Sequence, residues 1–257
     1  MSTFLFDDIV FGPIKSRRLG VSLGINLLPK DYKLCTFDCI YCECGFSEKG
    51  KSGKIPTVTE YKDSLQKKLE ELKSEGITPD VFTFAGNGEP TIHPDFPEIV
   101  DFTILKRDEF FPNAKISVLS NSTMLHKQPV VDALKRVDNN ILKLDSAIDE
   151  TVKLMDAPNQ KSFSVKNTIE LLKQFGGNLI VQTMFLKGSV NGTEIDNTTD
   201  TEVRALIDAL KAINPKQVMI YSIDRDTPVQ TLQKIEKEEM EGIADKIRKA
   251  GFYVSVA

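Results

Sequence analysis

Short apolar runs alternate with amphipathic stretches along most of this 257-residue chain. From residue 81 onward, each apolar run is next to a stretch whose apolar residues recur at helical spacing. This alternation is typical of repeated βα units around a parallel sheet. The predicted strands are residues 21–27, 81–85, 116–119, 141–145, 179–186, 218–222 and 252–256.

Capping signals indicate where two of the helices begin. Thr57 and Glu60 have capping-box spacing before an amphipathic segment, and the same spacing recurs at Thr199 and Glu202. Gly76 lies where the first of these helices is expected to end. One connection is long: residues 187–199 are polar and rich in glycine, asparagine and threonine, which predicts a loop over the site or a disordered excursion.

The pattern predicts an α/β fold in a single domain over residues 1–257. We expect an N-terminal extension (1–20), a barrel core (21–225) and a C-terminal helix and strand (226–257). Six βα steps are enough for an open or partial (β/α)6 barrel, but too few for a closed barrel of about eight units. In either form, ligands are expected at the carboxyl ends of the strands.

Composition excludes several classes of protein. With 40% hydrophobic and 27% charged residues, the chain can bury a substantial core without disulfides, which excludes the membrane, collagenous and disordered classes. The first residues include Asp7 and Asp8 and no basic leader, so we expect a cytoplasmic protein. A net charge of −4 argues only weakly against a nucleic-acid partner, because it does not exclude a local basic site.

All four cysteines lie within ten residues, at Cys35, Cys39, Cys42 and Cys44. They are too close together to link distant parts of the chain, so in a reducing compartment they indicate metal binding or redox chemistry. The first three have C-x3-C-x2-C spacing, which suits an iron–sulfur cluster, and three thiolates leave one iron of a four-iron cubane open. A zinc knuckle made of all four cysteines is the alternative, although zinc sites usually pair two separated arms.

The same segment resembles the cluster-binding motif of the radical S-adenosylmethionine (radical SAM) enzymes, with Tyr41 as the aromatic residue before the last cysteine. The resemblance implies a partial TIM-like barrel in which Cys35, Cys39 and Cys42 hold a four-iron four-sulfur cluster. In that family the open iron binds S-adenosylmethionine, and reductive cleavage gives a 5′-deoxyadenosyl radical that abstracts hydrogen from a substrate. By the same resemblance Tyr41 contacts the cofactor, and Cys44 falls outside the motif.

A glycine-rich segment, Gly86-Asn87-Gly88-Glu89-Pro90, follows the strand at 81–85 and resembles a second motif of that family. The glycines would let the backbone approach the methionine amino group closely, and the Glu89 carboxylate would accept a hydrogen bond from it. Asn87 replaces the more usual second glycine of the family.

Polar and basic residues near other strand ends complete the predicted site. The resemblance assigns to the cofactor three residues that close the strands at 116–119 and 141–145, namely Ser120, Asn121 and Asp145. Basic side chains near the predicted barrel mouth could bind a phosphate or carboxylate of the substrate. These candidates are Arg17, Arg18, Lys187 and Arg225.

Residues 11–26 resemble the branch of the family that is grouped with wyosine-base-forming enzymes, which act on a guanosine derivative in transfer RNA. The resemblance implies a tRNA nucleoside or a small organic molecule as substrate, and an external electron donor such as flavodoxin or ferredoxin. Only Cys44 is left for the second cluster of the characterised wyosine-forming enzymes, so their reaction does not transfer directly. Two alternatives stay open: an activase of a glycyl-radical enzyme, and a non-catalytic iron–sulfur or zinc protein.

Overall fold

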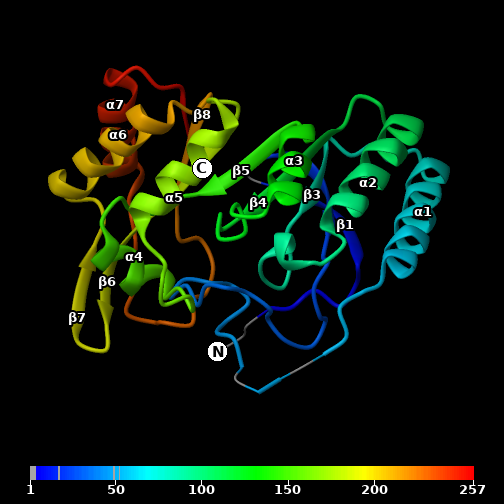
Figure 1. Ribbon diagram of the computed structural model, residues 1–257, viewed down its shortest axis with the longest axis horizontal. Coiled ribbons are helices and arrows are strands. Elements are labelled where there is room, and N and C mark those ends of the chain that lie inside the picture. The colour runs from blue at the N-terminus through cyan, green and yellow to red at the C-terminus, as the bar shows by residue number, and fades with distance from the viewer. Residues whose placement is uncertain (1–3, 17, 49, 52) are drawn as a thin grey trace.

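A curved sheet runs through the computed structural model, which describes residues 4–257 except residues 17, 49 and 52 (Figure 1). Its strands lie side by side in the order β1, β2, β3, β4, β5, β6, β8 and β10. Every neighbouring pair from β2 to β10 is parallel. The strands of this order are β1 (Val10–Ser16), β2 (Gly20–Ile25), β3 (Val81–Phe84), β4 (Lys115–Ser120), β5 (Asn139–Lys143), β6 (Ile180–Val190), β8 (Gln217–Ser222) and β10 (Val254–Val256).

Helices connect the parallel strands and cover the outer face of the sheet (Figure 1). They are α1 (Val58–Ser74), α2 (Phe96–Phe110), α3 (Gln128–Arg136), α4 (Asp149–Asp156), α5 (Val165–Leu172), α6 (Asp200–Ile213) and α7 (Lys237–Lys249), with short 3₁₀ helices η1 (Pro90–Ile92) and η2 (Lys173–Phe175). Alternating strands and helices confirm the predicted α/β architecture.

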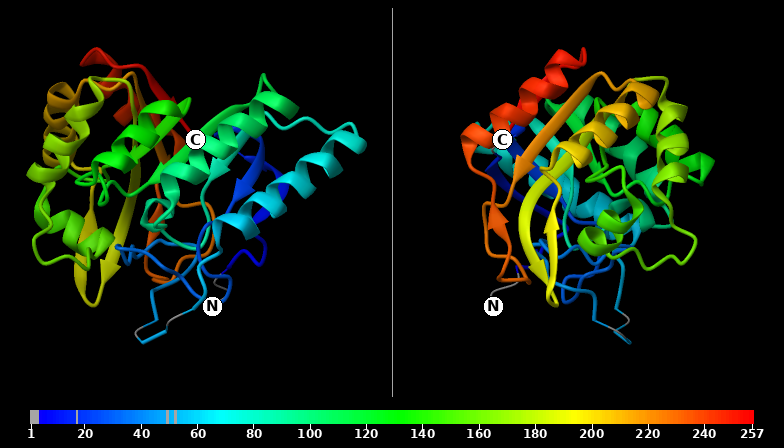
Figure 2. Two further views of the ribbon diagram at one scale, coloured as in Figure 1. Left: turned by 45° about the vertical axis from the view of Figure 1, so that its right-hand side comes forward. Right: turned by 90° about the vertical axis from the view of Figure 1, so that its left-hand side faces the viewer.

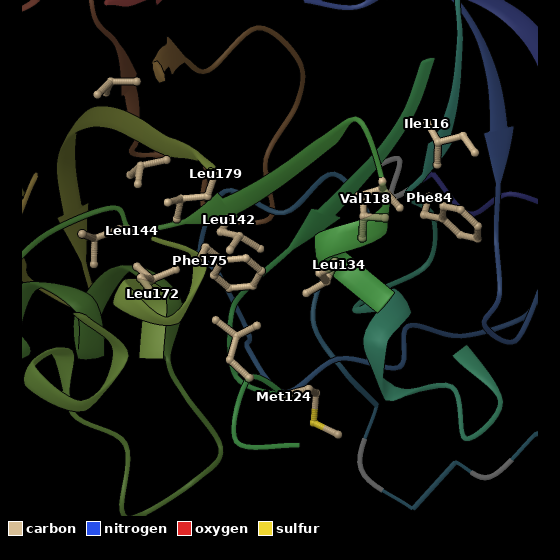
Figure 3. Close-up of a cluster of buried hydrophobic side chains, with 14 of the residues drawn as sticks. Phe84, Ile116, Val118, Met124, Leu134, Leu142, Leu144, Leu172, Phe175 and Leu179 are labelled. Carbon is tan, nitrogen blue, oxygen red and sulfur yellow. The ribbon is translucent and has the colours of Figure 1, made fainter. Parts of the chain in front are cut away.

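The main hydrophobic core lies between the helices and the outer face of the sheet (Figure 3). Phe84 of β3, Val118 of β4 and Leu142 of β5 belong to one buried cluster together with Leu134 of α3 and Leu172 of α5. Because side chains alternate along a strand, the intervening residues point to the inner face. The polar residues at these intervening positions are therefore available for a site inside the curve of the sheet.

The order of the strands does not close into a ring among the described residues, since β1 and β10 lie at its two ends. This confirms the predicted partial barrel. Part of the predicted N-terminal extension forms β1, which is antiparallel to β2. Gly12 and Pro13 interrupt the apolar pattern where the register of this pair is irregular, which hides the strand in the sequence.

The predicted long loop at 187–199 is wrong. Strand β6 continues to Val190 and pairs with the antiparallel strand β7 (Thr193–Asp196), and β9 (Gln233–Lys234) pairs with the same extension of β6 (Figure 2). Asn191 and Gly192 join β6 to β7 with φ angles of 50° and 80°. An Asn-Gly pair with positive φ at both positions is typical of a type I′ hairpin, so the turn was readable in the sequence.

The two predicted capping boxes have different outcomes. Thr57 caps α1 and the box with Glu60 is complete, and Gly76 follows the helix in the left-handed conformation, as predicted. Thr199 caps α6, but the reciprocal half of the box is absent. The Glu202 carboxylate instead accepts hydrogen bonds from the hydroxyls of Ser146 (2.6 Å), which follows β5, and Thr151 (2.5 Å) of α4.

Candidate functional site

The cysteine loop, residues 33–45, follows β2 and lies directly against the glycine-rich segment after β3. Leu34 and Gly88 form a parallel β-bridge. The Leu34 N–H donates to the Asn87 carbonyl at 2.8 Å, and the Glu89 N–H donates to the Leu34 carbonyl at 3.1 Å. A Cβ on Gly88, which has a φ of +138°, would lie 1.9 Å from the Leu34 oxygen. The glycine thus permits a close contact between the two motifs that the sequence singled out.

The four cysteines of the loop are free and partly buried. The Cys35 sulfur accepts hydrogen bonds from the Phe37 N–H and from Asn121 Nδ2, both at 3.5 Å. The Cys44 thiol donates to the Gly86 carbonyl at 3.4 Å. The first and last cysteines therefore contact the segments that follow β4 and β3.

Burial, hydrogen bonds and neighbouring charges shift the pKa values of the four thiols in different directions. Burial raises the pKa of Cys35 to about 12 and also raises the pKa of Cys39. A hydrogen bond with Cys44, together with the nearby Lys33 ammonium, outweighs burial and lowers the pKa of Cys42 to about 6. The hydrogen bond with Cys42, followed by burial, raises the pKa of Cys44.

Lys33 is a buried cation inside the cysteine loop, with only 3% of its surface exposed. Its Nζ donates to the Gly45 carbonyl at 3.0 Å and to Asp38 Oδ1 at 3.3 Å. Burial lowers the pKa of Lys33, but the charges of the cysteines, Cys42 first, and of Asp38 outweigh burial and raise it. Sequence reasoning missed Lys33, because nothing in a polar loop marks one lysine as buried.

The donor set of the loop fits an iron–sulfur cluster. In the described part of the chain, no three His, Cys, Asp or Glu side chains are placed to hold one metal ion. A four-iron cluster does not need ligands that converge on one point, because each cysteine binds a different iron atom. The loop offers three thiols in motif spacing, a buried ammonium group and a main-chain N–H donor to sulfur, all of which stabilise an anionic cluster.

Glu89 is buried, with 2% of its surface exposed, and its carboxylate links two strand ends. One oxygen accepts a hydrogen bond from the Asn121 N–H at 2.6 Å, and the other accepts from the Thr91 N–H at 3.1 Å and from the Thr91 hydroxyl. Burial outweighs these bonds and raises the pKa of Glu89. The carboxylate therefore fixes the glycine-rich segment to the end of β4.

Asn87, which departs from the usual glycine, ties three segments together. Its Nδ2 donates to the carbonyls of Pro29 (2.8 Å) and Phe6 (3.0 Å), and its Oδ1 accepts from the Phe6 N–H at 2.8 Å. Its own N–H donates to Asn26 Oδ1 at 3.1 Å. The amide side chain thus holds the N-terminal segment against the site, a role that no glycine could fill.

A buried network joins the cysteine loop to the end of β5. Lys143 forms ion pairs with Asp145 and with Asp156, the latter at 2.9 Å, and the Tyr41 hydroxyl contacts both Lys143 and Asp145. Burial lowers the pKa of Lys143, but the two carboxylates outweigh it and raise that pKa. Burial and the charge of Asp145 outweigh the attraction of Lys143 and raise the pKa of Asp156 to about 7. The sequence predicted Tyr41 and Asp145 but missed Lys143 and Asp156.

The two predicted residues at the end of β4 have different surroundings. Asn121 Nδ2 donates to the Thr36 hydroxyl at 2.8 Å, so Asn121 is in contact with the cysteine loop. The Ser120 hydroxyl accepts from the Ser122 N–H at 3.1 Å and lies near the Glu89 carboxylate. Asn121 and Ser120 thus reach the site through the cysteine loop and through Glu89, respectively.

The predicted basic residues are distributed around the site. Arg17 lies outside the described residues, whereas the Arg18 guanidinium stacks on the Tyr221 ring of β8 at 4.7 Å from its centre. Arg225 forms an exposed ion pair at 2.6 Å with Glu43, which lies between two cysteines. Lys187 pairs with Glu239 of α7 at 2.6 Å. Arg18 and Arg225 are therefore brought near the cysteine loop, and Lys187 belongs to the β6 extension.

A surface hollow of about 450 Å³ lies beside the cysteine loop. It is lined by Phe4, Phe6, Ile14, Lys15, Glu43, Arg225 and Asp226. The lining residues come from the N-terminal segment, β1, the cysteine loop and the segment after β8. The hollow therefore lies beside the cysteine loop, between β1 and the segment that follows β8.

Curated relatives cover most of the chain at modest identity. The chain is 30% identical over 235 residues to a protein named GTPase Obg from Brachyspira hyodysenteriae, a match that covers 90% of this chain and 32% of that protein. It is 29% identical over 236 residues to a UPF0026 protein from Helicobacter pylori strain J99, covering 90% of this chain and 71% of the relative. The chain thus spans about a third of the first relative and most of the second.

Solved structures show the same fold at low identity. A radical SAM methyltransferase from Sphaerobacter thermophilus superposes with a TM-score of 0.68 at 15% identity, covering 92% of this chain and 65% of that one. A structure of TYW1 with a lysine-pyruvate adduct bound has a TM-score of 0.57 at 14% identity, covering 89% and 73%. Among the described residues, no helix is long and apolar enough to cross a membrane.

A family model matches two thirds of the chain, including the cysteine loop. The model of the Radical SAM superfamily matches residues 31–201, a range that contains the cysteine loop, the glycine-rich segment and the network around Lys143. The sequence motifs, the partial barrel and this match agree with each other. The chain therefore belongs to the Radical SAM superfamily, whose cofactors are a four-iron four-sulfur cluster and S-adenosylmethionine.

Proposed function

We propose that this chain cleaves S-adenosylmethionine reductively at a cluster held by Cys35, Cys39 and Cys42. The observation that carries the proposal is the direct bridge between Leu34 and Gly88, because it brings the predicted cluster ligands beside the predicted methionine site. When bound, the two cofactors supply a 5′-deoxyadenosyl radical that removes hydrogen from a substrate, while the protein positions the reactants and excludes water.

The glycine-rich segment would bind the methionine end of the cofactor. Because Gly86 and Gly88 carry no Cβ, the segment packs directly against Asn26 and Leu34, and the Gly86 carbonyl accepts a hydrogen bond from the Cys44 thiol. The Glu89 carboxylate, held by main-chain donors, would keep the segment in place and face the amino group. Around it, Tyr41, Asp145, Ser120 and Asn121 would line the cofactor site.

The substrate would bind on the inner face of the partial barrel and enter through the 450 Å³ hollow beside the cysteine loop. Arg18 and Arg225 would flank that route. Arg17 and Lys187 would be further basic residues that bind the substrate. A tRNA nucleoside or a small organic molecule would fit a site with this combination of aromatic and basic side chains. An external donor, such as flavodoxin or ferredoxin, would supply the electron in the cytoplasm.

Anaerobic reconstitution with iron and sulfide tests this function. After reduction with dithionite and addition of S-adenosylmethionine, we expect 5′-deoxyadenosine, measured by chromatography against cluster content. A Cys39→Ala protein should lose the cluster and the product. Cys44→Ser is the matched control in the same loop and should keep the cluster, because Cys44 lies outside the motif.

Two outcomes would overturn the proposal. An intact, reduced cluster that gives no 5′-deoxyadenosine would favour a non-catalytic iron–sulfur protein. Stoichiometric zinc bound by all four cysteines, lost in Cys44→Ser, would favour the zinc knuckle. Product formation that depends on a partner enzyme, and not on RNA or metabolite fractions, would instead identify an activase of a glycyl-radical enzyme. The cofactor chemistry would then be the same, but the substrate would be a protein.

A further inference from the structure

Among the described residues, the N–H groups of two side chains on the inner face of the barrel have no acceptor, beginning with Gln182. Val181 and Phe185 of β6 belong to the outer core, so Gln182 between them points to the inner face. Gln182 is 6% exposed, and its Nε2 is buried without a hydrogen-bond partner. A buried donor left without an acceptor lowers the stability of the folded protein by about 1–3 kcal/mol, so such atoms are rare unless a ligand or water binds there.

Arg18 is the second donor. It comes from the turn between β1 and β2, and its guanidinium stacks on Tyr221. In the described part of the chain no carboxylate pairs with it, unlike Lys33, which has Asp38, and Lys143, which has two aspartates. An arginine stacked on an aromatic ring keeps the N–H groups at its edge available for a carboxylate or phosphate.

Strand register places these two donors in one region. Gln182 lies opposite Met219 in the β6–β8 pair, and Tyr221, two residues later, faces the same side. Leu19, the residue after Arg18, packs against the buried cluster of Ile141, Ile180 and Met219. Tyr221 and Cys39 both pack against the cluster of Tyr41 and Met184, so this region borders the cysteine loop.

We infer that Arg18 and Gln182 form an anion site on the inner face of the barrel, which binds a carboxylate or phosphate group. A ligand here must bring acceptors, because both side chains offer N–H groups, and the unpaired guanidinium favours a negative charge. The inference rests on the proposed function in taking this group to belong to a reactant. Its source is either the substrate or the carboxylate of S-adenosylmethionine.

Binding of two small anions tests the site directly. Inorganic phosphate and acetate are titrated calorimetrically into the anaerobically reconstituted protein at constant ionic strength. We expect at least one of them to bind, and Arg18→Gln and Gln182→Met each to weaken that binding at least about tenfold, since each removes a donor to a charged group. Arg204→Gln is the control, because Arg204 is exposed and its side chain bonds only a main-chain carbonyl.

Stability separates this role from a structural one. Because Gln182 Nε2 has no hydrogen-bond partner in the part of the chain that the structure describes, Gln182→Met should leave the urea midpoint unchanged or raise it. A clear fall of the midpoint would mean that Gln182 supports the fold. No binding of either anion to the wild-type protein, or equal binding to all variants, would also overturn the anion site.

Titration with S-adenosylmethionine identifies the source of the anion. If Arg18→Gln weakens cofactor binding and phosphate competes with the cofactor, the site holds the cofactor carboxylate. If cofactor binding is unchanged while phosphate binding is lost, the site holds the substrate. Formation of 5′-deoxyadenosine is measured separately, so a failure of the proposed function does not count as a failure of the anion site.

Discussion

Two buried lysines lie next to the cysteines, and their charges are balanced in different ways. Lys143 pairs with the carboxylates of Asp145 and Asp156, whose side chains are almost completely buried. Among the residues that the structure describes, Lys33 has a single carboxylate partner, Asp38, whose side chain is 37% exposed. The remaining negative charge around Lys33 comes from the cysteines of the loop when they are thiolates, Cys42 first.

This difference indicates which of the two lysine charges the protein balances without a bound cluster. The Lys143 network contains its own counter-charges, so it stabilises the fold whether or not a cluster is bound. The Lys33 ammonium reaches its full balance only when the cysteines are thiolates, which is their state as iron ligands. We therefore expect Lys143 to matter most for stability and Lys33 to matter most for the cluster.

Replacing Lys143 by methionine should give the largest effect. Lys143→Met leaves two carboxylates buried without their cation, and breaking a buried pair in this way costs about 3 to 5 kcal/mol. The free energy of unfolding from urea titration measures the loss. The double variant Lys143→Met, Asp156→Asn should recover part of it, and a loss well under about 1 kcal/mol would show that the network is exposed to water.

Replacing Lys33 by methionine should act on the cluster. Reduction adds negative charge, so loss of a buried cation should shift the cluster potential to more negative values by at least about 59 mV, one tenfold step for a one-electron couple. A redox titration followed by electron paramagnetic resonance measures the shift.

Matched variants separate charge from loop structure in that experiment. Lys33→Arg keeps the charge and should keep the potential close to that of the wild type. Lys51→Met removes an exposed lysine near the same loop, paired with Glu48, and should leave the potential unchanged. An unchanged potential in Lys33→Met at full cluster content would contradict the comparison.

Asp38→Asn should give the smallest effect. The Asp38 side chain is half-exposed, and an asparagine oxygen could still accept the Ser47 N–H bond that Oδ1 accepts at 2.7 Å. We expect a loss of less than about 1 kcal/mol in the free energy of unfolding. A loss as large as that of Lys143→Met would mean that Asp38, and not the thiols, balances Lys33.

The sequence was informative where chemistry follows from local spacing. The three cysteines and Gly88 lie within short motifs, and the structure brings those motifs into contact through Leu34. The alternation of apolar runs was enough to predict the partial barrel, because each strand buries one face under a helix. Hydrophobic period and motif spacing can be interpreted from the sequence because they depend on residues that are close together in the chain.

Burial of single charged residues was not readable in the same way. Lys33 and Lys143 have no neighbours in sequence that distinguish them from surface lysines, and the partner Asp156 comes from another element. Their environment depends on contacts between segments far apart in the chain. The hairpin at Asn191 is the opposite case, because its turn signal was local and the polar composition around it masked the strands.

The grip of Asn87 on Phe6 has a practical consequence for handling the protein. Both main-chain groups of Phe6 are bonded to one side chain of the glycine-rich segment, so residues 4–6 are held as part of the site. A label or surface anchor attached at residues 4–6 would act directly on the glycine-rich segment. Attachment elsewhere on the surface would leave this contact intact.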